Sequence, residues 1–293
     1  MMPKPRILLL GSTGMLGSML VRFLHKDTEL TYTGRSPEPV IACSGRYVGR
    51  MDIKDFASVQ SLVRSLEPDE IINCIGLIKQ KAEGKDPVQC IQVNSLFPHL
   101  LAKEAKATGS RVITFSTDCV FSGKSGNYSE LDPCDAEDIY GKSKYLGELI
   151  EAPGITIRSS IIGPELNSAI SLFDWFRGNK GGSVNGFTRA IYSGVTTLEM
   201  AKLVRFLVFE RKDFFGRWNV ASQALSKFEL LQLINAAFRL NITVSEDSSY
   251  FCDRSLNGDH FLKTTGYKVP SWPEMVAELR DFLNKSNGFE TGV

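Results

Sequence analysis

The stretch RILLLGSTGMLG, residues 6 to 17, decides the fold because it joins an apolar run to a glycine-rich turn and the start of a helix. Gly11, Gly14 and Gly17 have the spacing G-x-x-G-x-x-G. Glycines here allow a tight turn, close approach of the backbone to a pyrophosphate and close packing of helix on strand. The N–H groups at the start of the helix would also bind phosphate. The stretch therefore predicts a nucleotide-binding unit, and a glycine-rich turn without a ligand is the weaker alternative.

Segments typical of strands and helices alternate along the first half of the chain. The apolar patterns predict strands at 6–11, 30–35, 46–53, 70–76, 111–117 and 154–161, and helices at 15–26, 55–66, 94–109 and 138–148. This alternation predicts an α/β fold, a Rossmann-type doubly wound parallel sheet with helices on both faces. The pattern changes after about residue 162. We therefore expect a dinucleotide-binding domain at 1–163 and a smaller C-terminal substrate-binding lobe at 164–293, some segments of which rejoin the main sheet.

The composition excludes several classes of function. The chain has 293 residues and a net charge of +1, which argues against a nucleic-acid surface or a polybasic membrane anchor. Its longest apolar run, ILLLG at 7–11, is far too short to span a bilayer, and we expect no signal peptide. Six scattered cysteines without Cys-x-x-Cys spacing are typical of reduced thiols, and three isolated histidines do not predict a metal site. We expect a cytoplasmic protein that binds neither nucleic acid nor membrane.

The end of the second predicted strand indicates the cofactor. Proteins that bind NAD have an Asp or Glu there for the ribose 2′-hydroxyl, whereas this chain reads TYTGRS, with Arg35 and no carboxylate. An arginine at this position would neutralise a 2′-phosphate. The sequence therefore predicts NADPH (NADP) and leaves tolerance of NADH open. A surface arginine in a turn is the alternative.

Three side chains suggest a carbonyl reduction. Thr117 lies in FSTDCVFSG (115–123), where a predicted strand ends, while Tyr140 and Lys144 in DIYGKSKYLGE (138–148) lie four residues apart on one helical face. The Lys144 ammonium and the positive charge of oxidised nicotinamide would lower the phenol pKa from its ordinary value of about 10. Tyr140 could then give a proton to a carbonyl that Thr117 holds in line. Ser116 is interpreted as a turn former.

These motifs resemble those of extended short-chain dehydrogenases/reductases, and most closely the dTDP-4-dehydrorhamnose reductase family. The resemblance rests on GSTGMLG, NCIGLIK, VNSLFP, STDCVFSG, YGKSKYLGE and RSSIIG, and it extends from residue 6 to 163 and more loosely to about 280. It implies an NADPH-dependent oxidoreductase that reduces the C4 keto group of a nucleotide-activated 4-keto-6-deoxyhexose. Such an enzyme supplies deoxysugars for surface polysaccharide synthesis, as in dTDP-rhamnose biosynthesis. The family's catalytic set maps onto Thr117, Tyr140 and Lys144.

The motifs and the resemblance together give the expected contacts. The expected cofactor contacts are Gly11, Thr13, Gly14, Met15, Leu16, Gly17, Arg35, Asp52, Ile53, Cys74, Ile75, Gly76 and Lys144. The expected substrate contacts are Thr117, Asp118, Val120, Trp175, Arg189 and Arg254. In the second half of the chain an aromatic plane and two guanidinium groups would suit a sugar ring, a base and a diphosphate. Trp175 fits a core aromatic equally well.

Several alternatives stay open. A 4,6-dehydratase would resemble the motif T-D-E, but Cys119 stands where its glutamate base would be. A nucleotide-sugar epimerase would keep the same three catalytic residues. A non-catalytic NADP-binding regulatory subunit would be free to lose them, so the complete set favours an enzyme. The nucleotide (dTDP or UDP), the sugar stereochemistry, assistance by a divalent metal and the formation of a homodimer are not decided by the sequence.

Overall fold

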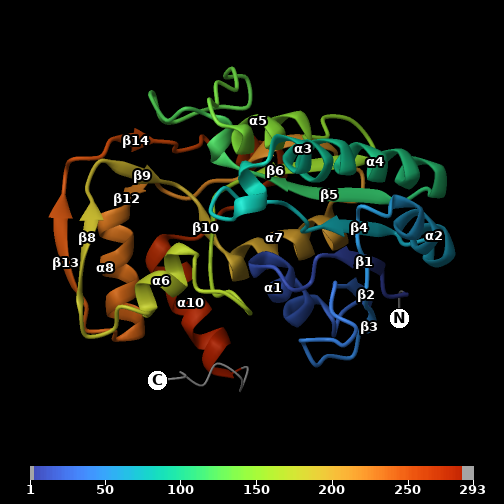
Figure 1. Cartoon of the computed structure of the whole chain (residues 1–293), viewed down its shortest axis with the longest axis horizontal. Coiled ribbons are helices and arrows are strands. Elements are labelled where there is room, and N and C mark those ends of the chain that lie inside the picture. Colours follow the sequence, from blue (N-terminus) through green and yellow to red (C-terminus); the bar gives the residue numbers. More distant parts are fainter. Residues whose placement is uncertain (1–2, 286–293) are drawn as a thin grey trace.

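The computed structural model describes residues 3–285, and its main feature is a seven-stranded sheet (Figure 1). Its strands are β1 (Arg6–Leu10), β2 (Glu29–Thr33), β3 (Arg46–Val48), β4 (Glu70–Asn73), β5 (Arg111–Ser116), β6 (Gly154–Arg158) and β11 (Gly216–Asn219). They lie in the order β11-β6-β5-β4-β1-β2-β3, and every neighbouring pair is parallel. The order reverses direction between β1 and β4, as in a doubly wound Rossmann sheet. The predicted fold class is confirmed.

Helices cover both faces because successive side chains of each buried strand point to opposite sides. In β1, Ile7 and Leu9 pack into one core together with α1 (Met15–Leu24) and α7 (Thr197–Glu210). Leu8 and Leu10 pack into a second core with α2 (Phe56–Leu66) and α4 (Phe97–Thr108). All four β1 side chains are at most 1% exposed. The apolar run of the opening stretch is therefore a central strand that is buried on both faces.

A smaller lobe stands beside the sheet, on the left of Figure 1. Its strands form short sheets in the orders β12-β9-β14 and β13-β8, and β7 pairs with β10. The elements are β7 (Ile161–Ile162), α6 (Leu172–Arg177), β8 (Ser183–Phe187), β9 (Ala190–Tyr192), β10 (Val195–Thr196), β12 (Leu225–Ser226), α8 (Lys227–Phe238), β13 (Thr243–Asp247), β14 (Cys252–Asp253) and α10 (Trp272–Lys285). The helix α9 (Asp259–Thr265) packs instead against β11 of the main sheet. Two segments from this part of the sequence, β11 and α7, belong to the main sheet and its covering layer. No helix within residues 3–285 is long and apolar enough to cross a membrane.

The helix expected at 94–109 differs from the prediction at its start. The helical stretch begins at α3 (Pro87–Cys90), because the Asp86 carboxylate accepts a hydrogen bond from the Val88 N–H at 2.9 Å and a proline follows the cap. It then passes through a π-helical turn, Ile91–Leu96, before α4 begins. The wide turn contains Asn94, whose side chain is buried. Such turns are frequent next to functional sites.

A buried ion pair stabilises the edge of the sheet formed by β11, β6 and β5. The Glu148 and Arg158 side chains are 1% and 0% exposed, and Arg158 Nε donates to Glu148 Oε1 at 2.7 Å. Arg217, from β11, lies 3.2 Å from the same carboxylate. Ser116 donates a further hydrogen bond to it at 2.7 Å. The network therefore connects β5, β6 and β11 to Glu148, which follows the helix α5 (Ile139–Leu146).

We predict that Arg158→Met lowers the free energy of unfolding by about 3 kcal/mol, because removing one partner leaves a buried carboxylate under-compensated. Urea denaturation measures the change. The matched control is Arg6→Met, since Arg6 and Asp69 form a pair in which both side chains are 48% exposed. That substitution should change stability by less than about 1 kcal/mol. Equal losses in the two variants would contradict a stabilising role for the buried pair.

Candidate active site

The turn after β1 forms an open cradle for phosphate. Gly11 has φ +86°, and a Cβ at Gly17 would collide with the Gly11 carbonyl oxygen, so both positions require glycine. Gly14 is the N-cap of α1, and no side chain caps the helix there. A Cβ at Gly14 would meet only the Gly11 carbonyl oxygen, at 3.6 Å. The free N–H groups and the open space at this helix N-terminus fit a dinucleotide pyrophosphate.

The neighbouring strands deliver the other expected cofactor residues to the same edge. Arg35 follows β2, is exposed, and forms no ion pair within residues 3–285. Asp52 and Ile53 follow β3, and the segment from Cys74 to Gly76 follows β4. Because the strands are parallel, their carboxyl ends meet along one line. A free guanidinium beside the cradle fits a 2′-phosphate better than a 2′-hydroxyl.

Thr117 is positioned by the end of β5. It caps a short 3₁₀ turn, Asp118–Val120, by accepting a hydrogen bond from the Cys119 N–H at 3.1 Å. Its hydroxyl donates to Asp118 Oδ1, also at 3.1 Å. The neighbouring Ser116 hydroxyl is bonded to Glu148, so it belongs to the buried network. Thr117 is thus the strand-end hydroxyl that is held at the edge of the sheet.

Helix α5 (Ile139–Leu146) brings Tyr140 against this turn. Asp138 caps the helix by accepting a hydrogen bond from the Gly141 N–H at 2.7 Å. A Cβ at Gly141 would collide with the Cys119 carbonyl oxygen, so only glycine lets α5 approach so closely. The phenol of Tyr140 consequently reaches the Thr117 hydroxyl, which stabilises its ionised form. The sequence YGK therefore determines the contact between the helix and the strand end.

Burial has the largest effect on the protonation of the expected Tyr140–Lys144 pair. Burial, with Cys119 and Asp118 adding to it, raises the pKa of Tyr140, and only the Thr117 hydroxyl opposes that rise to any extent. The Lys144 ammonium donates to the Phe115 carbonyl at 2.5 Å. The predicted lowering of the phenol pKa by Lys144 and bound oxidised nicotinamide together stays a prediction. Burial also lowers the pKa of Lys144 to about 8, against the opposing charge of Glu148. The sequence shows that Tyr140 and Lys144 are neighbours on a helix, but it does not show how deeply the two side chains are buried.

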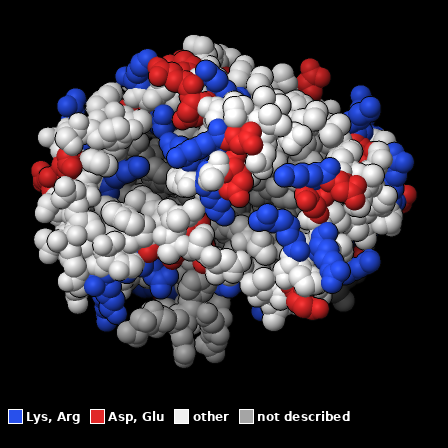
Figure 2. Space-filling model, viewed as in Figure 1, with Lys and Arg blue, Asp and Glu red and all other residues white. Residues whose placement is uncertain are grey.

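A cleft of about 890 Å³ joins these parts. Basic side chains border the hollow on this face of the molecule (Figure 2). The expected site residues that line the cleft are Gly11, Thr13, Gly14, Met15, Leu16, Arg35, Asp52, Ile53, Cys74, Ile75, Gly76, Thr117, Asp118, Tyr140 and Arg254. Gly17 and Lys144 do not line the cleft. Gly17 lets the start of α1 pack against Gly11, and Lys144 donates its hydrogen bond to the Phe115 carbonyl. No group of three or more His, Cys, Asp or Glu able to hold a metal occurs in the described part of the chain.

Three expected substrate contacts lie elsewhere. Val120 is fully buried and packs in a small core with Phe121. Trp175 is 42% exposed on α6 and does not line the cleft. Arg189 is exposed outside the lining, and its guanidinium lies 5.2 Å from the Phe251 ring centre. The positions of Trp175 and Arg189 depend on the packing of the lobe, which local patterns do not encode.

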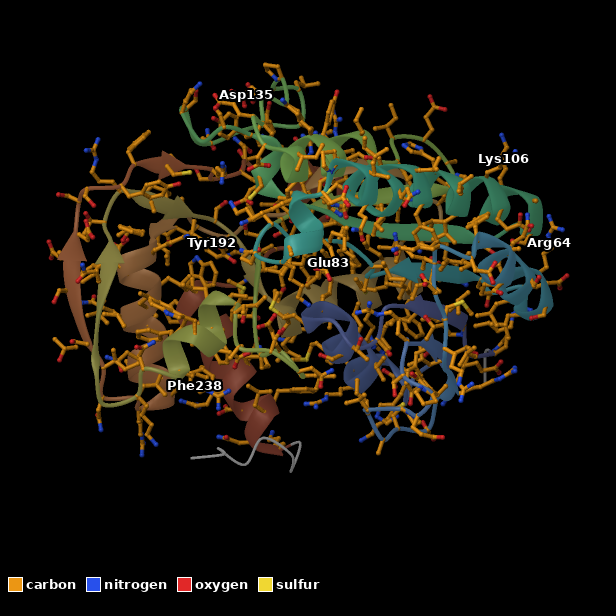
Figure 3. The ribbon with its side chains drawn as sticks, viewed as in Figure 1. Arg64, Glu83, Lys106, Asp135, Tyr192 and Phe238 are labelled. Atoms are coloured by element: carbon orange, nitrogen blue, oxygen red, sulfur yellow. The ribbon has the colours of Figure 1, made fainter. Side chains whose placement is uncertain are left out.

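The structure also brings in residues that the motifs did not indicate. Asn94 accepts a hydrogen bond from the Leu77 N–H at 2.9 Å and donates to Ser143 at 3.2 Å, which joins the loop after β4 to α5. An asparagine in an otherwise helical apolar pattern was the available signal. Lys79, from the segment after β4, and Tyr192, from the lobe, both line the cleft. Figure 3 labels Tyr192 together with Glu83, another lining residue.

Comparison with known proteins gives one family match and several relatives. The model of the RmlD substrate binding domain matches residues 5–154. The dTDP-4-dehydrorhamnose reductase of Streptomyces griseus is 32% identical over 148 residues, which are 50% of this chain and 44% of that protein. The methionine adenosyltransferase 2 subunit beta of Rattus norvegicus is 29% identical over 150 residues, 50% of this chain and 42% of that one. These matches thus span less than half the length of either relative.

A solved structure extends the likeness to nearly the whole chain. The dTDP-4-dehydrorhamnose reductase of Bacillus anthracis, crystallised in complex with NADP, superposes with a TM-score of 0.78. The alignment covers 96% of this chain and 99% of that one, with 20% sequence identity. At this identity the likeness shows the fold, including that of the lobe.

We predict that Lys144 loses its proton near pH 8, more than two units below an ordinary lysine, because burial disfavours the ammonium. Reductive ¹³C-methylation followed by NMR titration measures this, and Lys144→Met identifies the resonance. Between about pH 8 and 10.4 the unfolded chain binds a proton that the folded protein lacks. Stability relative to Lys144→Met should therefore rise with pH across that window. A midpoint near 10.4 would show that Lys144 is hydrated.

Proposed function

Because this chain belongs to the RmlD substrate binding domain family, we propose that it is an NADPH-dependent reductase that acts on the C4 carbonyl of a nucleotide-activated 4-keto-6-deoxyhexose. The observation that carries the proposal is the placement of Thr117 and Tyr140 in one cleft with the phosphate cradle after β1. The Streptomyces griseus relative bears the name of such a reductase. We further propose that the reaction takes place in the cytoplasm and supplies deoxysugars for surface polysaccharides.

The chemistry follows from the residues of the cleft. Bound NADPH would supply a hydride to the carbonyl carbon. The carbonyl oxygen must gain a proton, and Tyr140 is the acid within reach of the position that Thr117 defines. Its raised pKa keeps the phenol protonated at neutral pH until it is needed. The phenolate left behind needs a nearby positive charge, and Lys144, four residues along the same helix, is the cation that can supply it.

The nucleotide end of the substrate needs cations, and two that line the cleft are Lys79 and Arg254. Arg254 is held by a 2.8 Å hydrogen bond from its Nε to the Phe121 carbonyl, and its Nη1 lies 3.6 Å from Cys119 Sγ. Burial raises the pKa of Cys119 to about 11, and the charges of Lys79 and Arg254 both oppose that rise. Both cations therefore lie near this sulfur, and no ion pair engages either within the described residues. We propose that they bind the diphosphate, a role for which the sequence suggested Arg254 and Arg189.

Two other functions must be distinguished from that of a reductase. The first is a non-catalytic NADP-binding subunit, since one relative is named as a subunit of methionine adenosyltransferase, but the intact Thr117–Tyr140 arrangement favours an enzyme. An epimerase would use the same residues and regenerate its cofactor, so it would not consume NADPH in each cycle. A homodimer is compatible with either function and stays a separate question. Net oxidation of NADPH distinguishes the reductase from both alternatives.

The test of this function follows NADPH absorbance with dTDP- and UDP-4-keto-6-deoxyhexoses, and with free keto-sugars as controls. We expect turnover of a nucleotide sugar, and a loss of at least about 10²-fold in kcat for Tyr140→Phe with nearly unchanged NADPH affinity, because the phenol acts in the transition state. The matched control is Tyr145→Phe on the same helix, where Tyr145 is 42% exposed. Normal turnover by Tyr140→Phe would refute its role as the acid. NADPH binding without turnover of any sugar would favour the regulator.

The cofactor preference has its own test. Arg35→Ala should weaken NADPH binding by about 1.5–3 kcal/mol, the contribution of a hydrogen bond to a charged group, and should leave NADH binding nearly unchanged. Fluorescence titration measures both affinities. Arg46→Ala is the control, because Arg46 lies on the neighbouring β3 outside the cleft lining. Equal losses for the two cofactors would mean that Arg35 does not contact the 2′-phosphate.

A further inference from the structure

Tyr192 is a cleft residue to which neither the family motifs nor the mechanism assigns a role. It ends β9 and reaches the cleft from the lobe (Figure 3). Its ring packs on Trp272, with ring centres 5.4 Å apart. Trp272 is 2% exposed, and its Nε1 donates to the Gln223 carbonyl at 2.9 Å. The aromatic ring of Tyr192 therefore rests on a fixed support.

The hydroxyl group of Tyr192 has room but no partner. A Cβ at Gly194 would lie 2.6 Å from that hydroxyl, so the glycine leaves the space that the phenol occupies. Tyr32, Tyr47 and Tyr267 donate hydrogen bonds of 2.9, 2.7 and 2.7 Å to protein oxygens. By contrast, no hydrogen bond joins the Tyr192 hydroxyl to any residue of the described chain. Without a partner in the protein, this donor is available to a ligand that enters the cleft.

The two phenols of Tyr140 and Tyr192 converge on one short turn. Burial raises the pKa of both, and the nearby Asp118 and Cys119 add to the rise in each case. Asp118, Cys119 and both tyrosines line the same cleft, although Tyr140 comes from α5 and Tyr192 from the lobe. A molecule whose carbonyl contacts Thr117 and Tyr140 consequently has Tyr192 near its adjoining atoms.

We propose that Tyr192 is a positioning residue whose hydroxyl binds the C3 hydroxyl of the hexose. This rests on the proposed function. In a 4-keto-6-deoxyhexose the carbonyl carbon has two neighbours, C3 with a hydroxyl and C5 with the ring oxygen and a methyl group. The C3 hydroxyl is thus the polar group next to the reacting carbon. Held there by Tyr192 and at the carbonyl by Thr117 and Tyr140, the ring is fixed in orientation for reduction.

The experiment compares two substrates in two enzymes. The substrates are the nucleotide-activated 4-keto-6-deoxyhexose that the wild type reduces and its 3-deoxy analogue, and the enzymes are the wild type and Tyr192→Phe. With the hydroxylated sugar, Tyr192→Phe should lower kcat/KM about tenfold, the effect of one neutral hydrogen bond. With the 3-deoxy analogue the two enzymes should be equal. This cycle isolates the contact, because a general disturbance of the site would lower both rates together.

The control is Tyr267→Phe, which also loses a single hydroxyl group. Tyr267 donates to Glu199 outside the cleft, so this substitution should lower Tm and leave kcat/KM unchanged for both sugars. Equal losses of Tyr192→Phe on the two substrates, or no loss on either, would overturn the assignment while leaving the reductase function standing. If the wild type reduced no nucleotide sugar, the proposed function would fail, and the role of Tyr192 would fail with it.

Discussion

Every part of the proposed site depends on the parallel course of the seven strands of the main sheet. Parallel strands require a crossover after each strand, so the segments that follow β1, β2, β4 and β5 all emerge at one edge. The glycine turn, Arg35, the Cys74 segment and Thr117 come together for this reason. The contact of Gly141 with the Cys119 carbonyl then adds α5 to that edge. A larger residue at Gly141 would push α5 away from this edge and would separate groups that the chemistry needs together.

The sequence was informative where function depends on local geometry. The glycine spacing after β1, the arginine after β2 and the threonine after β5 are each defined within a few residues of a strand end, so they could be found without a structure. Trp175 and Arg189 could not be placed, because their directions depend on how the lobe packs. Tyr192 was missed for the same reason, and Lys79 was missed because it lies in the loop after β4, whose course the local sequence does not predict. The sequence also shows a lysine near Tyr140 but not the burial that raises the pKa of the phenol.

Glu148 links the stability of the fold to the chemistry of the cleft. Its carboxylate carries the buried contact with Arg158 and the one with Arg217, and it accepts the Ser116 hydroxyl next to Thr117. Its charge also favours the ammonium form of Lys144, against burial. Burying an ion pair is a weak source of net stability, because desolvation opposes the attraction. Here the Glu148 carboxylate also stabilises the Lys144 ammonium, so it contributes to the site as well as to folding.

The position of β11 in the sheet affects how the chain folds while the ribosome synthesises it. β11 covers the edge of β6, yet about 60 residues separate the two strands in the sequence. A growing chain therefore forms the strands from β1 to β6 while the backbone N–H and C=O groups along one side of β6 are still unpaired. An exposed edge of this kind is a template for pairing with another chain. The nascent polypeptide should be most exposed to aggregation, and most in need of a chaperone, in the interval between the synthesis of these two strands.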